Sequence, residues 1–173
     1  VLAKQFQAGQ TLLHQFKFKL KPPAEIVDMD LFARYLAIAD LLKAYHGIGW
    51  HNVRFYYNPI TAKLEPIGYD GYGELETSYH GGPFIGYKIN FDRHPQDYFK
   101  YLFTDQKFFK KYIGYLNAYT QPDFLAKQMD SYYPQLEERK ELILKEFKKY
   151  EFDSLKIIDR GRKLQALMRP YGE

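Results

Sequence analysis

The sequence predicts an α+β domain that is predominantly helical, and two observations support this prediction. Most of the chain places apolar residues three to four positions apart, which is the period of an amphipathic helix. Residues 53–69 instead form two short runs of strand-favouring residues around a turn, and the first run alternates between its two faces. This pattern is typical of a β-hairpin. We therefore expect helices before and after one small hairpin.

Length and composition exclude several classes. The 173 residues are enough for one domain, 1–173, which can bury a core without disulfides or metal. The absence of cysteine excludes a disulfide framework, a thiolate nucleophile and a cysteine zinc site. The net charge of +4 comes from intermixed signs, so we expect no nucleic-acid partner. No uncharged apolar run of about 18 residues occurs, so we expect no membrane span.

The first half of the chain contains the clearest predicted helix. Residues 2–18 favour a short helix, and paired prolines follow it. A second helix should begin at a cap near Asp28 and end near Tyr45, and its apolar residues cover most of its circumference. Asp40 lies inside this central helix and would need a partner if buried, for which Arg54 or a backbone donor is expected.

The segment after the hairpin is rich in glycine. Residues 71–90 contain five of the 12 glycines, and a loop of that length in a compact domain is usually functional. From Pro95 onward the chain returns to helical spacing. Helices are expected over 95–102, 105–119, from a Thr120 cap to Pro134, from Pro134 to about Tyr150, and over 153–169.

Two oxygen-bearing side chains flank the predicted hairpin. Asn52 precedes the first strand and Asp70 follows the second, so the hairpin should bring them to one point. Amide and carboxylate oxygens suit Mg²⁺ or Mn²⁺, with water and phosphate completing the coordination shell. Protein kinases use the same order: an asparagine in the catalytic loop, a hairpin, and then an aspartate before glycine.

Four short motifs follow one another along this region: His51-Asn52, Tyr56-Tyr57-Asn58-Pro59, Leu64-Glu65-Pro66-Ile67 and Tyr69-Asp70. In this order, within the stretch from Ala37 to Gly71, they resemble the CotH kinase family, named for a bacterial spore-coat protein. The run from Asp28 to Ala37 also resembles the helix that precedes these motifs in the family. The resemblance covers about residues 25–75. The rest of the chain fits the family only in its size and in its helical class.

The resemblance implies an atypical protein-kinase-like fold, with this chain as its mostly helical C-terminal lobe and the hairpin next to the metal site. It implies transfer of phosphate from ATP to Ser residues of a protein substrate. Asn52 and Asp70 would bind the Mg²⁺ or Mn²⁺ that holds ATP, and Asp70 would belong to the catalytic residues. The family places such proteins in spore coats, at the cell surface or among exported proteins.

The same resemblance implies that the chain is a fragment of a longer protein. A nucleotide-clamping lobe with a phosphate-binding lysine should precede the catalytic loop of a kinase. Only about 36 residues precede the resembling stretch. We therefore expect this lobe to lie upstream, and we expect the domain alone to fold but not to catalyse.

One position departs from the kinase pattern. A kinase loop carries its catalytic aspartate five residues before the metal-binding asparagine. That position is Gly47 here, or His46 if one residue is inserted, and no acid occurs from Leu41 to Asn52. His46 could accept a hydroxyl proton, since imidazole titrates near neutral pH. The alternative is a weak kinase or a pseudokinase that still binds nucleotide.

Each of these residues also has an ordinary structural interpretation. Asn52 and Asp70 could close the hairpin as turn and cap residues. His46 could interact with the end of the preceding helix, and His51 could bond to the backbone. These structural roles stay open at this stage.

Functions from different classes remain as alternatives. The first is the CotH-like kinase, and the second is a surface or binding module that uses its aromatic residues, 18% of the chain, to hold a partner or carbohydrate. Metal-dependent nucleotide binding would distinguish the two. A metal-dependent hydrolase that uses His46 and His51 is disfavoured, because these residues are not spaced for one helix turn.

Overall fold

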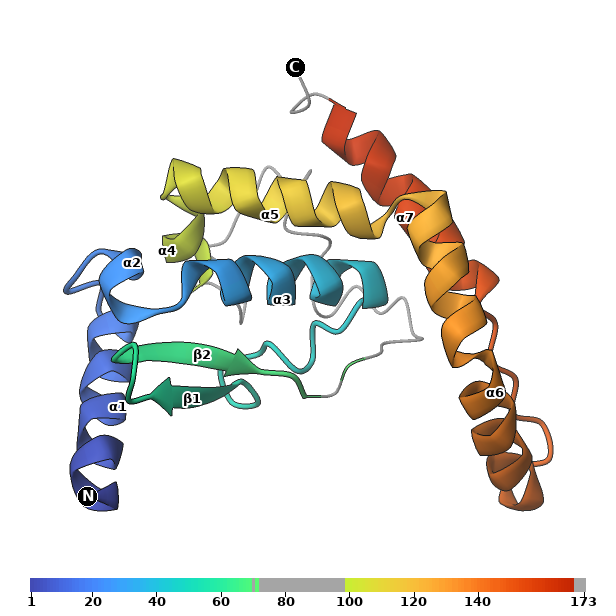
Figure 1. Ribbon diagram of the computed structural model, residues 1–173, viewed down its shortest axis with the longest axis horizontal. Coiled ribbons are helices and arrows are strands. Elements are labelled where there is room, and N and C mark those ends of the chain that lie inside the picture. The colour runs from blue at the N-terminus through green and yellow to red at the C-terminus, as the bar shows by residue number, and fades with distance from the viewer. Residues whose placement is uncertain (70, 72–98, 170–173) are drawn as a thin grey trace.

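The computed structural model describes residues 1–69, 71 and 99–169, and it places helices before and after one hairpin (Figure 1). The elements are α1 (Leu2–Lys17), α2 (Pro23–Ile26), α3 (Met29–Leu42), β1 (Arg54–Asn58), β2 (Lys63–Ile67), α4 (Lys100–Phe103), α5 (Gln106–Tyr119), α6 (Pro122–Glu146) and α7 (Leu155–Met168). This confirms a predominantly helical α+β fold. Among the described residues, no helix is long and apolar enough to cross a membrane. Most of the predicted glycine-rich loop 71–90 lies outside them.

Helix α3 is the centre of the described fold, as its sequence predicts. The carboxylate of Asp28 accepts hydrogen bonds from the amides of Asp30 and Leu31 at 2.9 Å each, which caps the helix. Phe32 and Leu36 are completely buried. Helix α5 packs along one side of α3 and the hairpin lies on the other (Figure 1).

The end of α3 differs from the prediction. The helix stops at Leu42 rather than near Tyr45, because Lys43 adopts a left-handed conformation with φ of 55°. The amide of Ala44 then donates to the carbonyl of Ala39 at 2.8 Å, which closes the helix. A left-handed residue at this point is usually glycine, so the glycines further along the sequence pointed to a later end.

The predicted hairpin over 53–69 is confirmed. Strands β1 and β2 pair in an antiparallel register that runs from Arg54 opposite Ile67 to Asn58 opposite Lys63. The Oδ1 of Asn58 accepts from the amide of Ile60 at 2.9 Å, which forms the turn. The ring of Phe55 packs on Phe32 of α3, with ring centres 6.0 Å apart. This contact fixes the hairpin on the central helix.

Three predicted boundaries in the C-terminal half are wrong, and one of them is the helix end expected near Tyr150, which falls at Glu146. Thr120 does not cap α6: its hydroxyl donates to the carbonyl of Leu116 at 2.8 Å and so closes α5. Gln121 is the N-cap residue of α6, and the helix continues through Pro134 instead of restarting there. Proline removes one backbone donor, but Pro134 is exposed, so water can satisfy the freed carbonyl.

Helix α7 is joined to the core at a close contact. A Cβ on Gly161 would lie only 3.0 Å from Cδ1 of Leu125, so a glycine allows α7 to approach α6. The side-chain amide of Gln165 donates to the carbonyl of Thr120 at 3.0 Å. These contacts hold α7 against the end of α5, while α6 and α7 extend away from the hairpin (Figure 1).

A charged cluster at the start of α3 ties this helix to α5. Asp30 accepts from Nζ of Lys111 at 2.6 Å and from the hydroxyl of Tyr115 at 2.8 Å. Arg34, one turn along α3, lies 2.9 Å from the second carboxylate oxygen. The hydrogen bond from Lys111, reinforced by Tyr115 and by the charges of both cations, lowers the pKa of Asp30 below its ordinary value of 3.8.

This cluster gives a pH-dependent prediction. A carboxyl group with a lowered folded-state pKa stabilises the fold above its unfolded-state pKa and loses that effect as the pH falls through the folded-state value. Asp30→Asn should therefore lower the melting temperature by about 2–4 °C at pH 7. In thermal melts from pH 7 to 2, the difference from wild type should shrink below about pH 4. A difference that is constant with pH would contradict this assignment.

Candidate functional site

The predicted site lies on the loop that joins α3 to β1, and residues 44–53 are called the site loop. The amide of Gly49 donates to the carbonyl of His46 at 3.2 Å, and the amide of Asn52 donates to the carbonyl of Gly49 at 2.8 Å. Ile48, in the middle of the loop, is completely buried. The loop is thus a series of turns anchored on the core by an apolar side chain.

The structure brings His46 and Asn52 together, two of the three predicted site residues. The Nδ2 of Asn52 donates to the backbone carbonyl of His46 at 3.1 Å and lies 3.1 Å from Nε2 of its imidazole. Donation to a carbonyl fixes which amide atom is the nitrogen. The Oδ1 of Asn52 is therefore the atom that could ligate a cation. The same bond also closes the site loop, which is a different structural role from the hairpin closure expected for Asn52.

His51, also in the site loop, lies next to His46. The rings of His46 and His51 meet edge to face, with centres 6.2 Å apart. A Cβ on Gly49 would lie 3.3 Å from Cε1 of His51, so a larger residue there would require this exposed imidazole to shift slightly. The two imidazoles pack ring against ring, which gives no support to a hydrolase that would use both as metal ligands.

Arg54 links the two ends of the hairpin. Its Nη1 donates to the carbonyl of Asn52 at 2.6 Å, and its guanidinium lies 5.7 Å from the ring centre of Tyr69. Asp70, the predicted second metal ligand and catalytic residue, lies outside the described residues. Tyr69 directly precedes Asp70 in the sequence. The side chain of Arg54 therefore connects Asn52 to the residue before Asp70.

The donor atoms at this point fit Mg²⁺ or Mn²⁺ only in part. Asn52 offers one hard oxygen, which both ions accept. Within the part of the chain that the structure describes, no group of three or more acidic or histidine residues could hold a metal ion. A cation site here would therefore depend on the carboxylate of Asp70 together with water and phosphate oxygens.

Asp40 has different partners from those expected. It is completely buried, and its carboxylate accepts from the hydroxyl of Tyr45 at 2.7 Å and from the hydroxyl of Tyr112. Arg54, which the sequence suggested as an alternative to a backbone donor, instead donates to backbone carbonyls of the site loop. The sequence signal for Tyr112 was weak: it is one tyrosine on the apolar face of α5, 72 residues away from Asp40.

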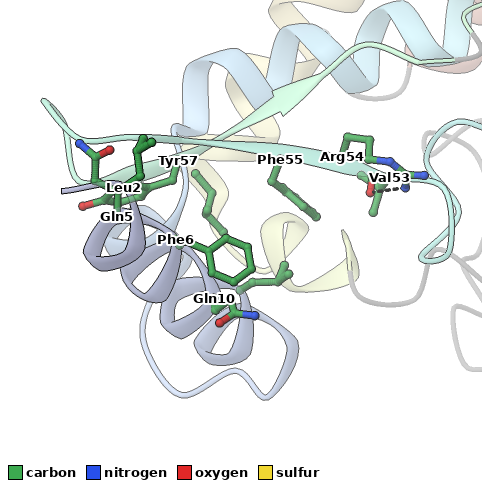
Figure 2. Close-up of a pocket in the computed structure, with 11 residues that line it drawn as sticks. Leu2, Gln5, Phe6, Gln10, Val53, Arg54, Phe55 and Tyr57 are labelled. Carbon is green, nitrogen blue, oxygen red and sulfur yellow. Dashed lines mark hydrogen bonds between the residues drawn. The ribbon is translucent and has the colours of Figure 1, made fainter.

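A hollow of about 560 Å³ lies between α1 and β1 (Figure 2). Phe6 and Gln10 line it from α1, and Phe55 and Tyr57 line it from β1. Among the described residues that line it, Arg54, near the site loop, is the charged one. No sequence motif predicted this hollow, and the side chains of His46 and Asn52 do not contribute to its wall.

Comparison of the chain with protein families, with curated proteins and with solved structures finds no match. The resemblance to the CotH kinase family therefore stays a prediction from the motifs.

Proposed function

We propose that this chain is the C-terminal lobe of a CotH-like atypical protein kinase that transfers phosphate from ATP to Ser residues of a protein. One observation supports the proposal above the others. His46 and Asn52 are in contact at the start of a hairpin whose far end leads directly to Asp70. In kinases an asparagine before a hairpin and an aspartate after it share one cation, and the order of Asn52, hairpin and Asp70 supports the same role here.

The roles of the residues follow from their chemistry. The Oδ1 of Asn52 and the carboxylate of Asp70 would hold Mg²⁺ or Mn²⁺, which would supply charge neutralisation at the phosphates of ATP. The imidazole of His46 would accept the proton of the Ser hydroxyl. The Ser oxygen then bonds to the γ-phosphorus, and the bond from this phosphorus to the ADP oxygen breaks. The proton leaves His46 to water.

A phosphoserine assay tests this function in the full-length protein. The protein is incubated with ATP and Mg²⁺ or Mn²⁺, and phosphoserine on it or on added protein is measured by mass spectrometry. Asn52→Ala should lower the rate at least about 100-fold, because one metal ligand is lost. Asn117→Ala is the matched control, since this amide is exposed on α5 and accepts a hydrogen bond from the side chain of Gln121. Equal loss in both variants would contradict the role of Asn52.

His46 has its own prediction. His46→Gln removes the proton acceptor but keeps a polar side chain, so phosphoserine formation should fall about 100-fold while nucleotide binding is retained. Rates are measured with saturating ATP, and binding is measured by calorimetry on the same preparations. His51→Gln, on the neighbouring exposed imidazole, should leave the rate within about twofold. An unchanged rate in His46→Gln would exclude His46 as the base.

The binding-module alternative is favoured by one specific surface. Tyr56 and Tyr69 on the hairpin are each 50% exposed, and Ile67 beside them is 45% exposed. Exposed aromatic side chains next to an arginine form a suitable contact surface for protein or carbohydrate. Under this alternative, Tyr56→Ala would abolish partner binding and ATP would have no effect on the protein.

A further inference from the structure

Three regions far apart in the sequence, the end of α3 with the site loop, α5 and α7, meet around one buried carboxylate, and the residues Asp40, Tyr45, Tyr112 and Arg160 are called the Asp40 cluster. Asp40 of α3 accepts from the hydroxyls of Tyr45 in the site loop and Tyr112 in α5. Nη2 of Arg160, in α7, donates to the hydroxyl of Tyr45 at 2.7 Å, and its Nε donates to the backbone carbonyl of Asp40 at 3.1 Å. The side chains of Asp40, Tyr45 and Tyr112 are each at least nine-tenths buried.

The hydrogen bonds of this cluster depend on one another. The hydroxyl of Tyr45 donates to Asp40 and accepts from Arg160, so it acts as donor and acceptor at once. Burial and the negative charge of Asp40 raise the pKa of Tyr45, which keeps this hydroxyl protonated as a donor at physiological pH. Arg160 adds a positive charge beside a buried carboxylate, where opposite charges interact strongly. Loss of Arg160 would therefore weaken the hold on Tyr45.

Tyr45 is the residue before His46, so the cluster sets where the site loop starts. The carbonyl of Tyr45 accepts from the amide of Ile48 at 3.3 Å, and the carbonyl of His46 accepts from Gly49 and from the side chain of Asn52. A shift of Tyr45 would be passed on through these turns. We propose that Arg160 is a positioning residue for the site loop, and that α7 controls the arrangement of His46 and Asn52 through it.

This inference rests on the proposed function for its catalytic consequence, but its physical core can be tested without nucleotide. Hydrogen exchange followed by mass spectrometry is measured on the full-length protein, wild type and Arg160→Met. Loss of charge-assisted bonds should speed exchange in peptides of the site loop about tenfold. Peptides of α1, which lies outside the cluster, should keep their wild-type rates.

Two further variants make the result decisive. Arg162→Met, on the same helix, removes an exposed guanidinium that pairs with Asp159, so the site loop should exchange as in wild type. Tyr45→Phe keeps the buried ring but removes the hydroxyl, so it should reproduce the effect of Arg160→Met. Unchanged exchange in the site loop, or an equal rise in α1, would overturn the proposal.

The phosphoserine assay separates this inference from the proposed function. If the kinase is active, Arg160→Met should lower kcat about tenfold with the KM for ATP unchanged, because alignment rather than binding is impaired. If exchange responds as expected but the wild type transfers no phosphate, the positioning role stands and the kinase proposal fails. If the wild type is active and Arg160→Met has the same kcat, the positioning role fails and the kinase proposal stands.

Discussion

Replacing Asp40 with alanine is expected to lower the free energy of unfolding by about 3–5 kcal/mol. Asp40 is completely buried and accepts hydrogen bonds from Tyr45 and Tyr112. Alanine would leave both hydroxyls buried without this acceptor and would open a small cavity beside them. A loss of this size is a large fraction of the stability of a single domain.

Equilibrium denaturation in urea measures this effect. Asp159→Ala is the matched control, because Asp159 is an exposed carboxylate that pairs with Arg162 at the surface. Its loss should change the free energy of unfolding by about 0.5 kcal/mol at most. Asp40→Asn should fall between the two, since its amide keeps an acceptor oxygen for one hydroxyl but turns its NH₂ group toward the other. Similar stability in Asp40→Ala and Asp159→Ala would show that the Asp40 cluster does not hold the fold.

The elements that the sequence predicted well are those with strong local signals. Helix α3 combines a capping aspartate with an almost continuous apolar surface, and the hairpin combines alternation with an Asn-Pro turn. Both signals act over fewer than about 15 neighbouring residues, which is the range that periodicity covers. For this reason the order and class of the main elements could be predicted without tertiary information.

The boundaries failed where a neighbouring segment competed with the local signal. Thr120 is a good helix cap in isolation, but its hydroxyl bonds backward to α5. Pro134 normally stops a helix, yet α6 continues through it at an exposed position. Lys43 takes the left-handed conformation that local preference assigns to glycine. In each case a rule about residue types predicts where a helix should begin or end, while the surrounding chain determines where it does.

The candidate site also combines contacts that the sequence could indicate with contacts that it could not. The contact between His46 and Asn52 lies within one loop, so motif spacing could indicate it. Two partners of Asp40 come from α5 and α7, which are 72 and 120 residues away along the chain, and no local pattern connects residues at that distance. Tyr45 lies only five residues from Asp40, but a tyrosine suits a core position as well as a hydrogen bond, so the sequence did not single it out. The sequence pointed to Arg54 or a backbone donor instead.

The most direct test of a metal-dependent nucleotide site is the melting temperature of the full-length protein with and without ATP and Mg²⁺ or Mn²⁺. Binding to the folded state alone should raise it by about 5–10 °C when ATP is present at about 100 times its Kd. Neither ATP with a chelator nor metal alone should reproduce the full rise. This control separates binding of the metal–nucleotide complex from binding of either component.

Asp70→Ala carries the largest expected effect on that shift. Loss of the carboxylate removes the charged ligand from the proposed site, so the rise with ATP and metal should disappear. Asp123→Ala, which removes an exposed carboxylate at the start of α6, should keep the wild-type rise. A metal-dependent rise that is present in wild type and absent in Asp70→Ala is the predicted result. No rise in the wild type, or an equal rise in Asp70→Ala, would contradict the kinase proposal.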